Sequence, residues 1–376
     1  MTIDKLRDQL KQLAPPLFAR LRDRGFDPTQ LETWAASLGG DHAARNRLSG
    51  TVTEVDPKII QQVPEPGSVA HQRLSNIGNA ALARGELAVC VLAGGMATRM
   101  GGVVKALVDA LPGITFLDMR LAEVDGVTAE HGAPLPLWLM TSEATNERIR
   151  DALNERLDGK NIATFEQFVS LRLTPEGELF YDEQEPSVYA TGHGDLPDAL
   201  RSSGLLQQFI ERGGRYVWIE NLDNLGARVD PAILGGHIES GARLTVELVD
   251  KRPGDKGGGP VLHDGRPIVA EHFRLPLDFD AERVLVFNTN TFLVDARALQ
   301  NLAMNWTYVE VHKDVEGRTA IQFERIVNEM TMAIEPRFLR VSREGTTSRF
   351  LPCKDFEDLK AIRDVVEELA KERGLR

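Results

Sequence analysis

The chain has 376 residues, of which 44 are basic and 56 acidic, so its formal net charge at neutral pH is −12. Hydrophobic residues make up 42% and charged residues 27%, a globular composition that excludes a disordered or fibrous protein. The acidic balance argues against nucleic acid and anionic membranes as partners, because both are bound through clustered Lys and Arg. At roughly 150 residues per domain, the length predicts two or three structural units.

The first 84 residues are expected to form a helical segment. Leucines recur at helical spacing from the start of the chain, and Asp27 before Pro28 is typical of a helix N-cap followed by proline at the first helical position. A stretch rich in Pro and Gly, residues 63–68, separates these helices from one more helix expected over residues 69–84.

Cysteine usage and hydropathy predict a reducing, cytoplasmic location. Cys90 and Cys353 lie far apart and have no CxxC or Cys/His partner nearby, so neither a disulfide framework nor a structural zinc site is predicted. The longest apolar stretch, residues 87–97, is shorter than the roughly 20 residues that span a bilayer. The N-terminus lacks the apolar stretch of a signal peptide.

From residue 87 onward, short apolar runs alternate with helix-length segments. Strands separated by helical crossovers predict a Rossmann-like α/β fold, in which helices cover both faces of a mostly parallel sheet. Residues 263–266 (HDGR) are expected to form an added hairpin, and residues 354–376 an amphipathic helix. The expected strands are Leu87–Leu92, Leu135–Met140, Arg215–Glu220, Arg243–Val249 and Arg283–Phe287.

The segment after the first strand, LAGGMATRMGG at residues 92–102, has the composition of a phosphate-binding loop. In open α/β sheets, ligands bind beyond the carboxyl ends of the strands. Paired glycines expose backbone N–H groups to phosphate oxygens, and Arg99 and Lys105 add positive charge. A flexible surface turn would not explain these polar residues so close after a strand. The patterns GxGxxG and GxxxxGK are absent here, which disfavours an oxidoreductase or a P-loop ATPase.

This loop and later segments resemble the UDP-sugar pyrophosphorylase family, and within it the glucose enzymes. One match would be weak evidence, but the matches follow the family order from about residue 87 to 365. The loop resembles the family's LxGGxxTRMG and following lysine through Gly94, Gly95, Thr98, Arg99, Met100, Gly101 and Lys105. Further similar segments are Met140–Thr145, Phe165–Gln167, Gly192–Asp195, Asn221–Ala227, Asp250–Lys251, Asp255–Gly258, Phe287–Asn290 and Arg349–Lys354.

The resemblance implies a GT-A-like nucleotidyltransferase domain over residues 85–340, between a helical segment at 1–84 and a helical tail at 341–376. It also implies the reaction, in which a phosphate oxygen of glucose-1-phosphate attacks the α-phosphorus of UTP and pyrophosphate leaves. The nucleophile is already an anion, so alignment and charge neutralisation suffice without a general base or a covalent side chain. Accordingly, we find no Ser/His/Asp or Cys/His arrangement from spacing.

The resemblance assigns catalytic roles to four positions. It implies that Arg99 and Lys105 face the β- and γ-phosphates and stabilise the leaving pyrophosphate, and that Lys313 touches the phosphates. It implies that Asp223 holds Mg²⁺, an ion that prefers hard oxygen ligands. Plainer alternatives remain open, since Asp223 could stabilise its own turn by Asx hydrogen bonds and Lys313 could be a solvated lysine on an edge strand.

Base recognition is expected from backbone groups of the glycine loop, with Gln167 reading the uracil edge because an amide offers both a donor and an acceptor. Plainer alternatives remain open for these side chains. Gln167 could be a surface amide, His193 a structural histidine and Lys251 a solvated lysine. Asn288 and Asn290 could be turn residues, and Gly257 and Gly258 part of a mobile loop. The residues expected to bind the nucleotide are Ala93, Gly94, Gly95, Thr98, Met140, Gln167, Gly192 and Asp223. Those expected to bind the sugar phosphate are His193, Asn221, Lys251, Gly257, Gly258, Asn288 and Asn290.

The sequence departs from the family pattern in places that bear on loop shape and sugar choice. Ala97 stands where the family usually has glycine, and Val103 and Val104 replace the residues before the lysine in a slightly shorter loop. Thr291 stands where the glucose enzymes have a second asparagine. After Lys354 only a helix is expected, whereas eukaryotic members continue into a C-terminal β-helix domain.

Two alternatives to a UDP-glucose enzyme stay open. One is a UDP-N-acetylglucosamine or broad-specificity UDP-sugar pyrophosphorylase, against which the GHGD segment at residues 192–195 favours the glucose enzymes. The other is a non-catalytic UDP-sugar binding protein. The joint presence of Arg99, Lys105 and Asp223 argues against it, because binding alone needs no groups that stabilise a leaving group.

Overall fold

An eight-stranded sheet forms the centre of the molecule, in a computed structural model that describes residues 3–255 and 257–376. Its strands lie in the order β2-β21-β15-β18-β14-β3-β8-β9. Only β18 runs antiparallel to its neighbours, so the predicted α/β fold with a mostly parallel sheet is confirmed. The strands are β2 (Ile60–Gln62), β3 (Leu87–Leu92), β8 (Leu137–Thr141), β9 (Ile162–Glu166), β14 (Tyr216–Asn221), β15 (Leu244–Asp250), β18 (Val286–Asp295) and β21 (Arg337–Arg340).

Four of the predicted strands match β3, β8, β14 and β15 to within two residues at either end, whereas the fifth overlaps β18 but was predicted with the wrong bounds. Its first residue ends a 3₁₀-helix, η7 (Ala281–Arg283), and β18 begins only at Val286 and runs on to Asp295. Asn288 and Asn290 therefore lie inside a strand and do not end one. Asn290 has a φ of 59°, and β18 shifts register against β15 nearby, which is a bulge that asparagine tolerates better than most residues.

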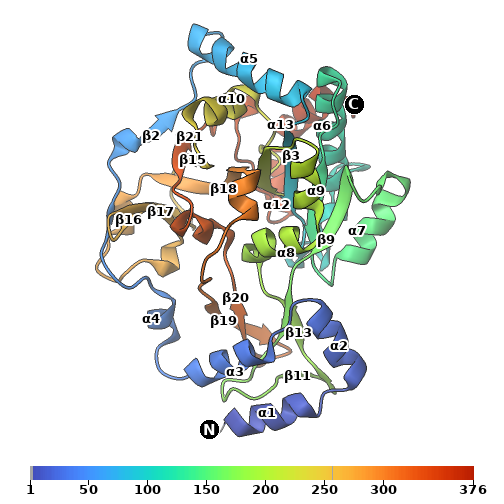
Figure 1. Ribbon diagram of the computed structural model, residues 1–376, viewed down its shortest axis with the longest axis vertical. Helices are drawn as coiled ribbons and strands as arrows, with labels where there is room; N and C mark the ends of the chain where they lie inside the picture. The colour runs from blue at the N-terminus through green and yellow to red at the C-terminus, as the bar shows by residue number, and fades with distance from the viewer. Residues whose placement is uncertain (1–2, 256) are drawn as a thin grey trace.

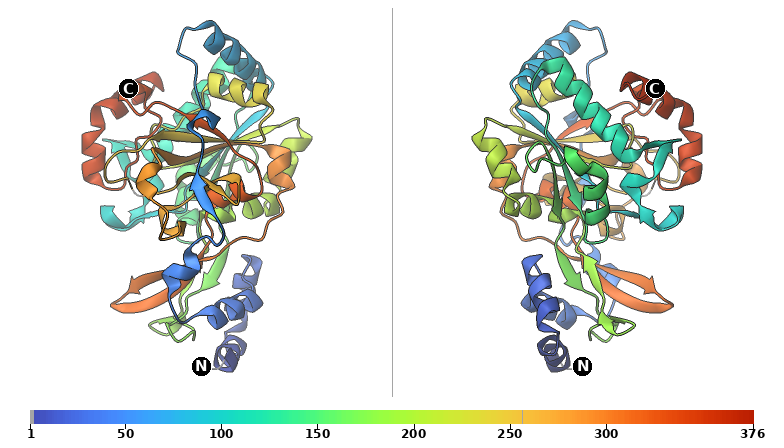
Figure 2. Two further views of the ribbon diagram at one scale, coloured as in Figure 1. Left: turned by 90° about the vertical axis from the view of Figure 1, so that its left-hand side faces the viewer. Right: turned by 90° about the vertical axis from the view of Figure 1, so that its right-hand side faces the viewer.

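Helices cover both faces of this sheet, as Figures 1 and 2 show. Alternate residues of β3 enter two different hydrophobic clusters, because successive side chains of a strand point to opposite faces. One face is covered by α5 (Val69–Ala83), α6 (Phe116–His131), α7 (Asn146–Leu153), α10 (Pro231–Ser240), α12 (Phe356–Ala361) and α13 (Arg363–Glu372). The other face is covered by α8 (Leu196–Ser202), α9 (Leu205–Glu211) and α11 (Ala296–Gln300).

The close crossing of α5 and α10 depends on two glycines. A Cβ on Gly78 would lie 1.9 Å from the carbonyl oxygen of Pro231, and one on Gly235 would lie 1.9 Å from that of Leu74. Neither backbone could make room, so any larger residue would force the helices apart. The C-terminal helix expected as a single element is two helices, α12 and α13, which pack against the same cluster.

At the opposite end of the molecule from α5, the N-terminal helices pack on small peripheral sheets (Figure 1). Trp34 stacks on Phe323 with ring centroids 5.0 Å apart. The side chain of Asp27 accepts hydrogen bonds from two backbone N–H groups, which confirms the predicted N-cap. The elements are α1 (Ile3–Lys11), α2 (Pro15–Asp23), α3 (Pro28–Ser37), α4 (His42–Asn46), β10 (Val169–Leu171), β13 (Val188–Ala190), β19 (Val309–Val315) and β20 (Arg318–Glu324).

Two short strands interrupt the segment expected to be helical. Both join sheets built by later parts of the chain: β1 (Val52–Glu54) pairs with β16 (Gly259–His263), and β2 pairs with β21. The predicted hairpin is confirmed in β16 and β17 (Arg266–Ala270), where Asp264 and Gly265 both have positive φ, as a tight hairpin turn needs. No helix in the described part of the chain is long and apolar enough to cross a membrane.

Candidate active site

A cavity of about 810 Å³ opens beyond the carboxyl ends of β3, β8 and β14. It has two walls. The sheet wall follows strands of the central sheet and is formed by Gly94, Gly95, Met96, Thr98, Lys105, Ser142, Gln167, Asn221 and Asp223. The outer wall comes from the peripheral strands and the loop after β13, and is formed by Arg172, Tyr189, Ala190, Gly192, His193, Lys313, Gln322 and Glu324.

The base of the glycine loop is fixed by hydrogen bonds to the neighbouring strand. The carbonyl oxygen of Gly94 accepts from the Ser142 hydroxyl at 2.9 Å. The N–H of Ala93 donates to the carbonyl of Met140 at 2.8 Å. Both Ala93 and Met140 are buried and lie outside the described lining of the cavity, so they position the loop through their backbones.

The tip of the loop is a small exposed hairpin of β4 (Met96–Ala97) and β5 (Val103–Val104). Thr98 lines the cavity, whereas Arg99 is exposed and lies outside the described lining. Gly101 has a φ of 90° and turns the chain back toward Lys105. Any contact between Arg99 and a bound phosphate therefore requires its long side chain to fold back over the cavity.

Lys105 and Asp223 form an ion pair on the sheet wall. Lys105 Nζ lies 2.5 Å from Asp223 Oδ2, and the two side chains are 14% and 24% exposed. The backbone oxygen of Asp223 accepts from the N–H of Cys353 at 2.9 Å, which holds the turn after β14 in place. The pair places a fixed cation and a hard oxygen ligand beside the glycine loop.

Gln167 lies against the same loop. Its backbone N–H donates to the carbonyl of Thr141 at 2.9 Å, just after β9. A Cβ on Gly94 would lie 2.6 Å from Gln167 Nε2, so the glycine leaves room for this amide. The structure thus brings the proposed base-reading side chain to the sheet wall.

His193 lines the outer wall with a defined tautomer. Its Nδ1 accepts a hydrogen bond from the N–H of Val327 at 3.0 Å, so a neutral ring carries its proton on Nε2. Burial lowers the pKa of His193 below its usual range, although the nearby Glu324 carboxylate opposes this. His193 is therefore a neutral N–H donor at pH 7. Gly192, at φ 100°, packs so closely on Arg325 that a Cβ would lie 2.6 Å from its carbonyl oxygen.

Behind His193, a buried ion pair holds the outer wall to the rest of the fold. Asp195 accepts from the N–H of Phe168 at 3.0 Å, from the Thr191 hydroxyl at 2.6 Å and from Arg325 Nε at 2.7 Å. Arg325 also donates to Asp198 on α8 at 2.8 Å. Burial raises the pKa of Asp195 to about 6, while Arg325 and the hydrogen bonds act in the opposite direction.

Three residues expected at the sugar phosphate lie elsewhere. Lys251, Gly257 and Gly258 line a separate pocket of about 20 Å³. Lys251 Nζ donates to the carbonyl of Ala281 at 3.2 Å and to Glu282 at 3.1 Å. The structure therefore does not bring this loop into the main cavity.

A chain of hydrogen bonds connects that loop to the main cavity through the asparagines. The N–H of Asn288 donates to the carbonyl of Gly258 at 2.8 Å, and Asn288 Oδ1 accepts from the N–H of Asn290 at 3.0 Å. Asn290 Nδ2 then donates to Asn221 Oδ1 at 2.8 Å. Asn221 is the member of this chain that lines the cavity. Thr291, the departure from the family pattern, is buried.

Several outer-wall residues were not predicted from the sequence. Arg172 donates to Gln322 at 3.0 Å, and Glu324 lies 3.7 Å from Lys313 Nζ. A usable signal was present: residues 309–324 alternate apolar and polar side chains around a Glu-Gly turn, which is typical of a hairpin. That reading would have placed Gln322 and Glu324 beside Lys313.

A mostly parallel sheet with a glycine loop and a Lys/Asp pair beyond its strand ends defines a nucleotide-binding α/β protein. Residues 42–373 match the family model described as UTP–glucose-1-phosphate uridylyltransferase, and the chain belongs to this family.

Relatives agree with this assignment. The chain is 30% identical over 295 residues to the UTP–glucose-1-phosphate uridylyltransferase of Hordeum vulgare, covering 74% of this chain and 61% of the relative. It is 28% identical to that of Solanum tuberosum, covering 86% and 72%. The fold is similar to that of a Leishmania major UDP-glucose pyrophosphorylase variant in complex with UDP-glucose, with a TM-score of 0.69, 20% identity and coverage of 96% and 78%. The chain thus spans less than three quarters of the length of these curated relatives.

Proposed function

We propose that this chain catalyses the reaction of UTP with glucose-1-phosphate to give UDP-glucose and pyrophosphate. The observation that carries the proposal is the Lys105–Asp223 ion pair beside the glycine loop, inside a cavity large enough for a nucleotide sugar. Membership of the uridylyltransferase family supports it.

The nucleotide occupies the sheet wall in this proposal. Backbone N–H groups of Gly94 and Gly95 approach the phosphate oxygens, and Gln167 pairs with the uracil imide because it offers both a donor and an acceptor. Lys105 stabilises the negative charge that collects on the departing pyrophosphate. Arg99 reaches the same phosphates from the loop tip.

The sugar phosphate occupies the space between the two walls. His193 donates from Nε2, and Asn221, held by Asn290, presents a fixed amide. Lys313 adds positive charge from the outer wall, where it reduces the repulsion between the sugar phosphate and the UTP phosphates. Gly258 and Asn288 act on the sugar indirectly, through the hydrogen bonds that lead to Asn290 and Asn221, and Lys251 and Gly257 belong to the loop that these bonds support.

Mg²⁺ is the cofactor that we propose, with Asp223 as its protein ligand. Within the described residues, no cluster of three ligating side chains includes Asp223, so the protein would supply this one carboxylate and leave the other positions to substrate oxygens or water. One carboxylate with substrate phosphates is a ligand set that Mg²⁺ commonly takes, and the residues present fit it. Bound there, the ion supplies charge neutralisation and a template for the phosphates.

The test is release of pyrophosphate from UTP and Mg²⁺ with glucose-1-phosphate, run beside N-acetylglucosamine-1-phosphate and galactose-1-phosphate. Release with glucose-1-phosphate at the highest kcat/KM supports the proposal. A higher kcat/KM with another sugar overturns the substrate and keeps the reaction. UTP binding without release from any sugar overturns the enzyme and favours a UDP-sugar binding protein. We further propose a cytoplasmic location, since both cysteines are free and buried.

A further inference from the structure

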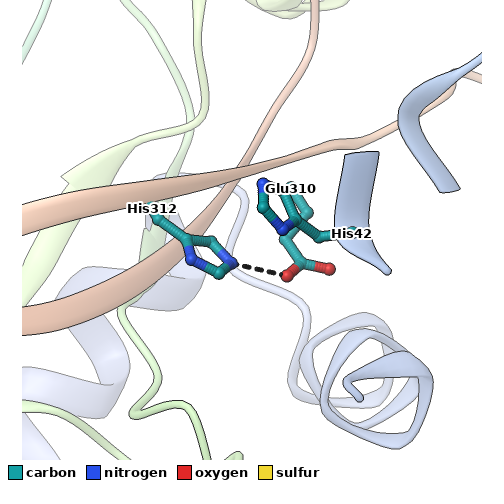
Figure 3. Close-up of side chains that lie close together, drawn as sticks. All are labelled: His42, Glu310 and His312. Carbon is teal, nitrogen blue, oxygen red and sulfur yellow. Dashed lines mark hydrogen bonds and ion pairs between the residues drawn. The ribbon is translucent and has the colours of Figure 1, made fainter. Parts of the chain in front are cut away.

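Three metal-binding side chains meet where α4 packs on β19, away from the main cavity. His42 comes from α4, and Glu310 and His312 come from β19 (Figure 3). One ligand atom from each lies within 4.8 Å of the others. His312 Nε2 is 2.8 Å from Glu310 Oε1, and the two imidazole rings stack with centroids 4.2 Å apart.

Hydrogen bonds between α4 and β19 hold the contact that brings these side chains together. Asn46 Nδ2 donates to the carbonyl of Glu310 at 2.8 Å, and the N–H of Glu310 donates back to Asn46 Oδ1 at 2.9 Å. Both residues are buried, so this reciprocal pair fixes α4 against the strand. Arg45 Nε donates to Glu310 Oε2 at 3.2 Å, which leaves Oε1 on the side of the histidines.

We propose that His42, Glu310 and His312 bind one Zn²⁺ ion, with water completing the coordination. Two imidazole nitrogens and one carboxylate oxygen form a ligand set that suits Zn²⁺ and not Mg²⁺, which prefers oxygen ligands. For Nε2 to bind the ion, a neutral His312 ring takes the tautomer that carries its single proton on Nδ1, so the number of protons on the ring does not change. Zinc ligands at roughly 2.0–2.2 Å place neighbouring ligand atoms about 3.3–3.6 Å apart. The 2.8 Å contact between His312 and Glu310 would therefore widen slightly, and ligand atoms now up to 4.8 Å apart would come closer.

No local motif marks this site, because its ligands come from two segments that lie far apart in the chain. His312 and Glu310 are two residues apart on one strand and thus share a face, but His42 reaches them only through the fold.

The site lies on the opposite face of β19 from the candidate active site. Side chains alternate along β19, so Glu310 and His312 face α4 while Lys313 lies on the other face, which lines the cavity. Gln322 and Glu324 of β20 pair opposite Val311 and Val309 and share that cavity face. A metal that fastens β19 to α4 therefore stiffens the strand that carries Lys313.

The experiment titrates Zn²⁺ into the tag-free, full-length protein by calorimetry, with excess Mg²⁺ and without nucleotide. We expect one ion per chain. His42→Ala and His312→Ala should each weaken binding by at least the roughly 10–100-fold that loss of even an outer-shell partner causes. His272→Ala, which removes an exposed histidine outside the cluster, is the matched control and should bind as the wild type does.

Co²⁺ provides a second measurement, since its visible absorption distinguishes a site with nitrogen ligands from loose surface binding. The spectrum should appear in the wild type and in His272→Ala and be absent from His312→Ala. Glu310→Gln, which keeps a hydrogen-bonding side chain, covers the case in which an alanine variant misfolds. No saturable Zn²⁺ binding, or equal binding by wild type and a folded His312→Ala, would overturn the site. Since UTP is absent, this result is independent of whether the uridylyltransferase proposal holds.

Discussion

The two walls of the cavity are built differently. The sheet wall carries its polar groups on short loops directly after β3, β9 and β14, strands whose neighbours pair with them along their length. The outer wall consists of two-stranded sheets that pack on the N-terminal helices. Lys105 on the sheet wall is 14% exposed, whereas Lys313 on the outer wall is 47% exposed. Groups that must be placed accurately are better held on the sheet wall, which follows strands of the central sheet.

We expect the largest effect on stability from breaking the Arg325–Asp195 ion pair, which holds the outer wall to the rest of the fold. Arg325→Leu should lower the free energy of unfolding by about 3–5 kcal/mol, because it leaves the Asp195 carboxylate buried without its partner. Arg325 also lies over the rings of Phe168 and Trp306, so packing is lost as well. Urea denaturation measures the change. Arg297→Leu, which alters an exposed arginine on α11, should stay within about 0.5 kcal/mol of the wild type.

The pH dependence of the unfolding free energy of Arg325→Leu identifies the cause of its destabilisation. Burial already raises the pKa of Asp195 to about 6 in the folded protein, so the folded state binds more protons than the unfolded state between about pH 4 and 6. The contribution of Asp195 to stability is thus present below that window and lost as the pH rises through it. Without Arg325 the pKa should rise further, and the variant should be less destabilised at pH 5 than at pH 8. Equal destabilisation at both pH values would assign the effect to packing alone.

Lys105→Ala should have the largest effect on catalysis. Removing a preorganised cation from a partly buried site is expected to lower kcat by about 10²–10³-fold, because the charge on the leaving pyrophosphate loses its partner. Circular dichroism should show an intact fold. Lys360→Ala, on the exposed side of α12, is the matched control. Turnover near the wild-type value would show that Lys105 has no role in catalysis. It would also show that the two walls do not differ in function as proposed.

Asp223→Asn should reduce activity somewhat less, by roughly 10–100-fold, and should raise the Mg²⁺ concentration needed for half-maximal rate. An amide keeps the size of the side chain but lacks the negative charge that attracts the ion. The measurement is a Mg²⁺ titration of the rate for both proteins. An unchanged midpoint would show that Asp223 serves only as the partner of Lys105.

The same difference between the walls explains what the sequence could predict. Gly94, Gln167 and Asp223 each lie within two residues of the end of a central strand, and the carboxyl ends of parallel strands meet at one edge of the sheet. Lys105 follows at the end of the loop that Gly94 begins. Local order along the chain therefore implied spatial proximity. The resemblance to a known family then supplied roles that strand order alone could not.

The outer wall depends on contacts between segments far apart in the chain. Arg325 donates a hydrogen bond to Asp195, 130 positions away in the sequence, and Arg172 donates one to Gln322, 150 positions away. No local sequence pattern could predict either contact. The same reason applies to β18, whose continuation through Asn290 depends on pairing with β14 on one side and β15 on the other. A short apolar run followed by Asn-Thr-Asn is typical of a strand end until those neighbours are known.

Lys313→Ala should have the smallest effect and gives the sharpest comparison with Lys105. The Lys313 side chain is half exposed and its Nζ lies 3.7 Å from Glu324 Oε1, so solvent and a carboxylate already screen its charge. We expect kcat/KM to fall by about tenfold at low ionic strength, and this deficit to shrink in 0.5 M salt, whereas the Lys105→Ala deficit should persist because buried charges are screened less. Steady-state kinetics of both variants at two salt concentrations measure this. A salt-independent loss from Lys313→Ala as large as that from Lys105→Ala would mean that the outer wall closes over bound substrate and excludes water from Lys313, which would make both walls rigid parts of one catalytic site.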